Sequence, residues 1–202
     1  MNLRLTRVLI VLVVAAAALA GFWLAHRLDH SMPALTSGTW LPQPRDPGEF
    51  SLTDQNNGQF TAARLKGAPT LVYFGYTHCP DVCPLTLLQL AQVVKTGVVP
   101  GLRVVFISVD PARDTPSQLA QYMRAFDPDF IGLTGSAAML QTVAHRFGVA
   151  YLRVDLPGGD YSMDHSSTIF LMDSHAHNVA VFNAPYEVKS LTDDLRRAAG
   201  AL

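Results

Sequence analysis

The sequence predicts an α/β sandwich, in which buried strands alternate with helices, preceded by one apolar amino-terminal helix. Residues 71–76 and 102–109 form two apolar runs, each long enough for a strand that is buried on both faces. Between them, apolar side chains recur at helical spacing, at Leu85, Leu88, Ala91 and Val94. Gly97 follows as a stop signal. A strand–helix–strand unit of this kind places its two strands in parallel.

The apolar amino-terminal helix covers residues 8–25, a run without a charged side chain that is just long enough to span a bilayer. Arg4 and Arg7 precede it, as basic residues precede both signal peptides and membrane anchors. The triplet Ala18-Leu19-Ala20 is similar to a cleavage site, but the apolar run continues past it, which favours an uncleaved anchor over residues 1–26. No Arg-rich transit sequence precedes it, so we expect a bacterial inner membrane, with the carboxyl-terminal domain in the periplasm.

Residues 27–48 are predicted to be a linker. They contain four of the thirteen prolines and no sustained hydrophobic period, which is typical of a semi-extended tether. The globular domain is then predicted over residues 49–202. It opens with a hairpin over residues 50–62, where Asn57-Gly58 separates two short runs of alternating apolar residues.

The rest of the domain continues the alternation. Thr115 and Gln118 form a capping box that begins one helix, and Ser136 caps another that ends before Gly148. Two more strands and a last helix are predicted near residues 168–172, 179–182 and 191–199. Strands that alternate with helices and end in a hairpin and a helix describe a thioredoxin-like α/β sandwich.

The charge and the cysteine content exclude some functions. Fifteen basic and sixteen acidic residues give a net charge of -1, with no basic block that could follow a phosphate backbone, so we expect no nucleic-acid partner. Two cysteines in an exported protein are by default a disulfide. A disulfide between residues this close would exclude few unfolded conformations and so would stabilise the fold little. A redox or metal-binding role therefore explains the two cysteines better than a structural disulfide does.

Both cysteines lie in the turn after the first predicted strand. Pro84 belongs in the first turn of a helix, so the helix begins near Cys83, with Cys79 just before it. Both sulfurs then face the positive end of a helix dipole, which favours thiolate over thiol. The spacing of i and i+4 brings the sulfurs within reach of each other or of one metal ion and does not choose between these.

His165 favours the metal. Thiol–disulfide catalysts of this fold use CxxC and place a proline before the final hairpin, whereas this loop is one residue longer and residues 161–170 contain no proline. His165 stands instead at the entry to a strand that we expect to neighbour the cysteine strand. Two thiolates and one imidazole suit Cu(I) and accept Cu(II), with zinc as the competing ion. Cys79, Cys83 and His165 are therefore the predicted ligands.

Four sequence blocks, in order within residues 38–200, resemble the SCO/SenC family. They are CPDVCP at 79–84, SVDPARDTP at 108–116, LTG at 133–135 and DHSSTIFLMD at 164–173. The resemblance implies a membrane-anchored, thioredoxin-like copper chaperone, not a turnover enzyme, whose ligands are Cys79, Cys83 and His165. It also implies delivery of copper to the binuclear centre in subunit II of cytochrome c oxidase, reduction of that subunit's cysteines, and contact with other periplasmic copper carriers.

Two other functions stay open at this point. One is a thiol–disulfide oxidoreductase or thiol peroxidase, with Cys79 as the nucleophile and Cys83 as the resolving thiol. The other is a redox or copper sensor that signals to a membrane partner. All three functions need the reactive pair, and His165 discriminates best because a disulfide catalyst does not use it as a ligand.

Other polar residues are expected to have supporting or no roles. His78 is expected to be exposed, and the HxH pair of His175 and His177 would bind Cu(II) only weakly. Asp164 is a candidate to orient the neighbouring histidine. The acidic and basic residues that follow the second strand, Asp110, Arg113 and Asp114, are expected to pair and fix their loop.

Overall fold

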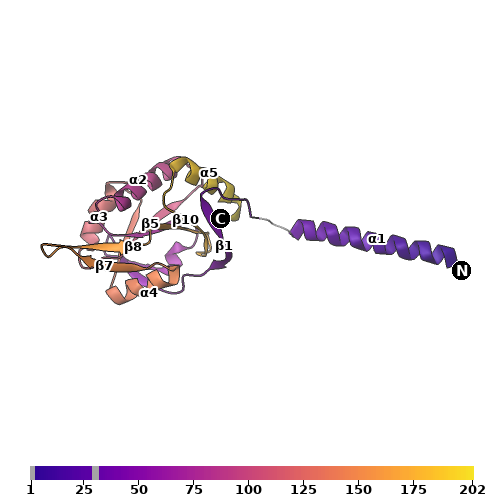
Figure 1. The fold of residues 1–202 in the computed structure, drawn as a ribbon, viewed down its shortest axis with the longest axis horizontal. Helices are drawn as coiled ribbons and strands as arrows, with labels where there is room; N and C mark the ends of the chain where they lie inside the picture. Colours follow the sequence, from indigo (N-terminus) through magenta and orange to yellow (C-terminus); the bar gives the residue numbers. More distant parts are fainter. Residues whose placement is uncertain (1–2, 29–31) are drawn as a thin grey trace. The chain divides into compact units, whose positions relative to one another are not determined.

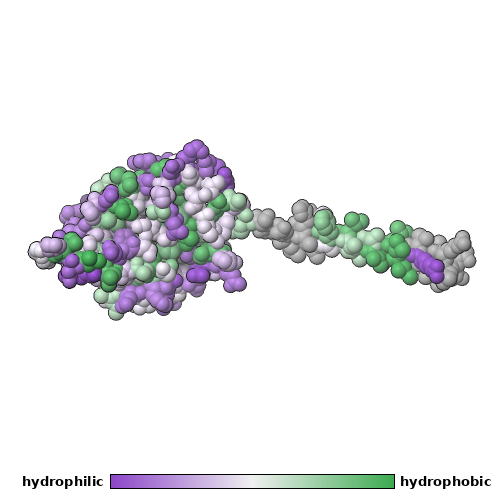
Figure 2. Space-filling view, in the orientation of Figure 1, coloured by the Kyte–Doolittle hydropathy of each residue, from purple (hydrophilic) through white to green (hydrophobic). Residues whose placement is uncertain are grey.

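The computed structural model describes residues 3–28 and 32–202 and divides the chain into two compact units, residues 1–33 and 34–202 (Figure 1). The first unit contains α1 (Leu3–Leu28), along which apolar side chains are visible in Figure 2. Counted over the residues that the structure describes, no helix is long and apolar enough to cross a membrane. The anchor over residues 1–26 therefore stays a prediction.

The second unit is built on a mixed sheet in the order β1-β10-β9-β4-β5-β6-β2-β3. Three parallel strands form its centre: β4 (Thr70–Gly75), β5 (Arg103–Ser108) and β6 (Ile131–Thr134). The other strands run antiparallel to their neighbours: β1 (Gly38–Arg45), β2 (Ser51–Asp54), β3 (Gln59–Thr61), β9 (Thr168–Met172) and β10 (Asn178–Asn183). All six residues of β4 are buried, as its apolar sequence predicts.

Helices cover both faces of this sheet. They are α2 (Val82–Lys95), α3 (Pro116–Arg124), α4 (Ala137–Phe147) and α5 (Val188–Ala198), with 3-10 turns η1 (Ala62–Leu65) and η2 (Ala199–Ala201). Figure 1 shows α2, α3 and α5 on one face and α4 on the other. Ring contacts follow this division, with Phe106 against Tyr122 of α3 at 6.0 Å and Phe74 against Phe147 of α4 at 5.4 Å. The predicted thioredoxin-like sandwich is thus confirmed.

The predicted helix ends are also confirmed where a capping residue marks them. The Thr115 hydroxyl accepts a hydrogen bond from the Gln118 N–H at 3.2 Å, and the Ser136 hydroxyl accepts one from the Met139 N–H at 3.3 Å. Gly148 ends α4 at φ 73°, in the left-handed region that glycine enters at low cost. Local hydrogen bonds of this kind can be predicted from sequence because both partners lie within one turn.

The structure differs from the predicted linker over residues 27–48. Residues 29–31 lie outside the described residues, but β1 pairs with β10, with Gly38 opposite Phe182 and Trp40 opposite Ala180. The register is interrupted between Trp40 and Arg45, a segment that contains two prolines. Proline lacks an N–H and is tolerated on an edge strand such as β1, so the proline content was not a sign of a free tether.

The buried face of α2 contains only part of the apolar series from which the helix was predicted. Leu85 and Leu88 are 54% and 47% exposed, whereas Leu87 and Leu90 are fully buried. The predicted helix is confirmed and Ala91 is buried, but apolar residues occur almost all round the helix, so the helical period did not identify which face is buried. Thr86 and Cys83 share the buried face, which brings polar and sulfur atoms into the core.

A second, two-stranded sheet was not predicted. It consists of β7 (Tyr151–Asp155) and β8 (Tyr161–His165), which pair antiparallel with Tyr151 opposite His165. Most of its residues are exposed or half-buried, so the sequence lacks the apolar alternation that marks a strand. This β7–β8 hairpin matters because its last residue is His165.

Candidate metal centre

The two cysteines occupy the turn between β4 and α2. Cys83 lies in the first turn of α2 and is completely buried, whereas Cys79 precedes the helix and is partly exposed. The Cys83 N–H points to the Cys79 sulfur at 3.4 Å. This amide is one of the unpaired donors at the helix start, so the helix stabilises negative charge on Cys79. The predicted position of both cysteines at a helix amino terminus is confirmed.

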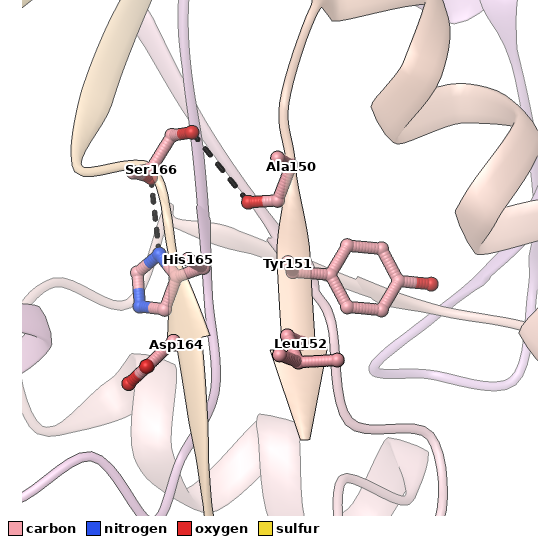
Figure 3. Close-up of a pocket in the computed structure, with 6 residues that line it drawn as sticks. All are labelled: Ala150, Tyr151, Leu152, Asp164, His165 and Ser166. Carbon is pink, nitrogen blue, oxygen red and sulfur yellow. Dashed lines mark hydrogen bonds between the residues drawn. The ribbon is translucent and has the colours of Figure 1, made fainter. Parts of the chain in front are cut away.

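His165 reaches the cysteines from the end of β8. Its Nε2 lies 3.4 Å from the Cys83 sulfur, and its Nδ1 lies 3.0 Å from the carbonyl oxygen of Ser166 (Figure 3). Because a carbonyl only accepts, Nδ1 carries the proton, and the lone pair of Nε2 faces the sulfur. The orienting role predicted for Asp164 is therefore performed by the backbone of Ser166.

One ligand atom each from Cys79, Cys83 and His165 lies within 4.8 Å of the other two. The structure thus brings the three predicted residues together, although His165 is 82 residues from Cys83 in sequence. Two sulfurs and one imidazole nitrogen form a soft to borderline donor set, which copper and zinc both accept. Three protein ligands leave room for a fourth ligand from outside.

The two thiols have very different pKa values. The hydrogen bond from the Cys83 thiol lowers the pKa of Cys79 to about 3, with further help from the backbone N–H groups of Cys83 and Asp81. The pKa of Cys83 is raised, because its proton is held by Cys79 and because it is buried. The reduced pair therefore carries one negative charge and one shared proton. The charge lies on the more exposed sulfur, where an attacking nucleophile is useful.

Core residues fit closely around the Cys83 sulfur. A Cβ on Gly75 would lie 2.9 Å from this sulfur and 2.7 Å from the Phe106 ring, so only glycine fits here. The Tyr73 hydroxyl points to the same sulfur at 3.8 Å from a fully buried side chain. Burial raises the pKa of Tyr73, so the hydroxyl keeps its proton and acts as a donor. The Cys83 side of the site is dry and tightly packed.

The β7–β8 hairpin is held to the domain by a charged cluster. Arg113 donates from Nε to Asp110 at 2.6 Å and from Nη1 to the Tyr161 carbonyl at 3.0 Å. Arg113 and Arg153 stack on the Tyr161 ring, with Cζ atoms 3.6 and 3.8 Å from its centroid. The Tyr161 hydroxyl donates to Asp110 at 2.9 Å. The predicted pairing of Asp110 with Arg113 is confirmed, but sequence reasoning missed Tyr161, which connects it to the hairpin.

Asp114 fixes the turn that leads into Cys79. Its buried carboxylate accepts hydrogen bonds from the Thr77 N–H and hydroxyl and from the Ser108 hydroxyl, the last two at 2.7 and 2.6 Å. Burial raises the pKa of Asp114. His78 lies next in the chain with its ring 47% exposed and its Nδ1 3.1 Å from the Thr77 hydroxyl. His78 is thus held away from the three candidate ligands, as predicted.

A hollow of about 400 Å³ opens beside His165, lined by Ala150, Tyr151, Leu152, Asp164, His165 and Ser166 (Figure 3). Ser166 ties its two walls together, since its N–H and hydroxyl both donate to the Ala150 carbonyl, at 3.2 and 3.5 Å. The hollow is broad and open, so it exposes the histidine side of the site to an approaching partner and does not enclose a small molecule.

A thioredoxin-like sheet whose cysteine turn is completed by a histidine from a neighbouring hairpin defines a class of proteins that bind a metal ion with redox-active thiols. Comparison with known proteins identifies the family. The chain belongs to the SCO1/SenC family, whose family model matches residues 41–200.

The similar proteins include copper-bound structures. A SCO2-like protein of Rickettsia conorii is 39% identical over 157 residues, which cover 74% of this chain and 75% of the relative. The crystal structure of Arabidopsis thaliana ScoI with copper bound has a TM-score of 0.73 and 37% identity, and the match covers 77% of this chain and 98% of that one. The copper-bound structure of Bradyrhizobium japonicum ScoI has a TM-score of 0.67 and 42% identity, with coverage of 74% and 97%.

Proposed function

We propose that this protein is a copper metallochaperone that binds one copper ion through Cys79, Cys83 and His165 and passes it to an acceptor protein. The observation that carries the proposal is the convergence of these three ligand atoms within 4.8 Å. The copper-bound structures of two relatives at 37% and 42% identity support copper over zinc as the ion.

The arrangement of protons suits metal capture. Cys79 is already a thiolate, and the His165 Nε2 lone pair faces the site, so two ligands need no deprotonation. Cys83 holds the remaining proton and releases it when the metal binds. Oxidation of the two thiols to a disulfide removes two electrons and two ligands, so the oxidised chain would not hold the ion.

Release would proceed by ligand exchange. The three protein ligands leave an open coordination position, and the hollow beside His165 leaves that side accessible. A ligand of the acceptor can therefore bind before a ligand of this chain departs, so the ion is never free. Of the three residues, His165 is the one on a peripheral hairpin, and we infer that it leaves first.

The acceptor that we propose is subunit II of cytochrome c oxidase, with other periplasmic copper carriers as further partners. The family resemblance supports both, since two of the four sequence blocks that resemble the family contain the three ligands. We also propose an uncleaved single-pass anchor over residues 1–26 in a bacterial inner membrane, with the domain in the periplasm. The uncharged run over residues 8–25 supports this location.

A second candidate function is thiol–disulfide exchange with the acceptor. The low pKa of Cys79 beside a protonated Cys83 favours it. Cys79 would attack an acceptor disulfide to form a mixed disulfide, and Cys83 would then displace the acceptor thiol. The acceptor gains two electrons from the pair, one proton from Cys83 and one proton from solvent, and this chain is left with a Cys79–Cys83 disulfide. The same geometry would serve a sensor that reports copper or redox state to a membrane partner.

Copper titration of the reduced full chain tests the main proposal. We expect one copper ion per chain, with a sulfur-to-copper charge-transfer band that changes in the His165→Ala variant. His78→Ala is the matched control, because that ring lies outside the site. An unchanged band in His165→Ala would disprove the three-ligand site. Catalytic reduction of a disulfide substrate without copper binding would favour the oxidoreductase.

A further inference from the structure

The turn between β9 and β10 gathers a second set of metal-binding side chains. It contains Asp173, His175 and His177, and it follows the last residue of β9, whereas His165 precedes the first. The turn therefore lies at the opposite end of β9 from the cysteines. An ion bound in this turn would be a different ion from the one at the thiols.

The backbone of the turn is held firmly. The Asp173 N–H donates to the His177 carbonyl at 2.9 Å, and the Ala176 N–H donates to the Asp173 carbonyl at 3.0 Å. Ser174 is tied to neighbouring segments by bonds to Gly67 and Leu202. Asp173 itself is only 9% exposed. The side chains of the turn are therefore attached to a backbone whose conformation is fixed by hydrogen bonds.

The two oxygens of the Asp173 carboxylate have different roles. Oδ1 accepts from the backbone N–H groups of His175 and His177, at 2.9 and 2.8 Å. Oδ2 instead faces both imidazoles, with the His177 Nδ1 at 3.4 Å and the His175 Nδ1 at 4.0 Å. One oxygen therefore shapes the turn while the other points between two nitrogen donors.

The imidazoles can complete a site without movement of the backbone. Their rings are stacked at an interplanar angle of 16° with centroids 6.3 Å apart, so the side chains must rotate before one ion can bind a nitrogen of each ring. Bonds from a metal ion to imidazole nitrogen or carboxylate oxygen are about 2.0–2.2 Å. The His175 and His177 side chains are 80% and 43% exposed, so rotation about their side-chain bonds can bring both nitrogens inward. A cavity of about 60 Å³ adjoins them, and its charged lining residues are Asp46, Glu49 and Lys66, so two negative charges face one positive charge there.

We propose that this turn binds one divalent transition-metal ion through Asp173 Oδ2 and the imidazoles of His175 and His177, with water in the other positions. Two borderline nitrogens and one hard oxygen without sulfur disfavour Cu(I). They suit Cu(II), Ni(II) and Zn(II), of which Cu(II) binds most tightly in the Irving–Williams order. The chain would then carry two sites of different preference, a thiol site for reduced copper and a histidine site for oxidised copper.

The test uses the full chain with Cys79→Ser and Cys83→Ser, so that the result does not depend on the thiol site or on its proposed function. Cu(II) is added against a competing chelator and followed by electron paramagnetic resonance. We expect a bound ion with coupling to two nitrogens, and His175→Ala with His177→Ala should weaken that binding by about tenfold or more. Zn(II), added as a second probe, should compete for the same site.

Matched variants separate the metal site from the fold of the turn. Asp173→Asn keeps an oxygen that can accept from the two backbone N–H groups but loses the charge at Oδ2, so it should weaken Cu(II) binding without loss of folding. His78→Ala and His145→Ala should leave binding unchanged, since these exposed rings lie elsewhere in the domain. Full Cu(II) binding by the His175→Ala/His177→Ala chain would overturn the site, and full binding by Asp173→Asn would overturn the role of the carboxylate.

Discussion

The thiol side and the histidine side of the candidate metal centre are built differently. Cys83 is completely buried and contacts Gly75 and Tyr73 of the central strand β4. His165 lies on the two-stranded β7–β8 hairpin, most of whose residues are exposed or half-buried. The core thus fixes one sulfur, whereas a few peripheral contacts fix the imidazole. The affinity for an ion can therefore change at the hairpin while the fold stays intact.

The largest expected effect concerns the two thiols themselves. Because the pKa of Cys79 is lowered, its thiolate persists as the pH falls from 7 to 5, whereas an ordinary thiol of pKa near 8.5 becomes about a hundredfold less reactive. Alkylation by iodoacetamide, located by mass spectrometry, should modify Cys79 at pH 5 and spare Cys83. The unfolded reduced chain is the control. Equal modification of both cysteines would contradict the difference between the partly exposed Cys79 thiolate and the buried Cys83 thiol.

Gly75→Ala tests the core side. The new Cβ would meet the Cys83 sulfur at 2.9 Å and the Phe106 ring at 2.7 Å, so we expect a loss of about 2 kcal/mol in the free energy of unfolding, together with weaker copper binding. Denaturant unfolding measures the first effect. Gly200→Ala is the matched control, because nothing lies within 4 Å of its added Cβ. A Gly75→Ala chain as stable as the wild type would show that the core is looser than described.

Arg113→Ala tests the hairpin side. It removes the contacts to Asp110 and to the Tyr161 carbonyl and ring, so the hairpin and His165 should lose their fixed position. We expect copper affinity to fall by about tenfold, as for other groups that orient ligands, with a normal rate of disulfide formation. Arg153→Ala removes only an exposed ion pair and one stacking contact, and should have a smaller effect. Equal effects of the two variants would show that Arg113 does not orient the histidine.

The smallest expected effect comes from Tyr73→Phe, which deletes one hydrogen bond to the Cys83 sulfur. The Cys83 sulfur shares the single proton and the single negative charge of the reduced pair with Cys79, so loss of this bond should disfavour the reduced pair by about 1 kcal/mol or less and lower its reduction potential. Equilibration with a dithiol buffer measures this shift. Tyr122→Phe also removes a buried hydroxyl, but one that has no hydrogen-bond partner among the residues that the structure describes, and should leave the potential unchanged. A shift of equal size in both variants would assign the effect to packing.

The sequence predicted the parts of the molecule that depend on neighbouring residues. The sequence features that predict each of these parts lie within a few residues of one another. The parts are the buried strand β4, the helix caps at Thr115 and Ser136, and the cysteine turn. β1 could not be predicted, because its partner β10 is about 140 positions away and nothing local distinguishes it from a proline-rich tether.

The site was predicted to a similar degree. Cys79 and Cys83 follow from their spacing, and His165 follows from its place where thiol–disulfide catalysts of this fold carry proline, and the structure brings the three together. The contacts that hold the β7–β8 hairpin in place could not be predicted from the sequence. Tyr161 and Asp110 form their hydrogen bond only when the hairpin folds back over the end of β5. The backbone of Ser166, which orients His165, has no signature in the side-chain sequence at all.

The start of the folded domain has a mechanical consequence. The Asp194 carboxylate of α5 accepts hydrogen bonds from the backbone N–H groups of Thr36, Ser37 and Gly38, at 2.8, 2.7 and 3.0 Å. Although burial opposes ionisation, these bonds lower the pKa of Asp194 to about 2, so the carboxylate stays charged under physiological conditions. Any pull on the chain before Thr36 would load this junction and the edge pairing of β1 first. The cysteines in the turn between β4 and α2 would be shielded from that strain until the junction yields.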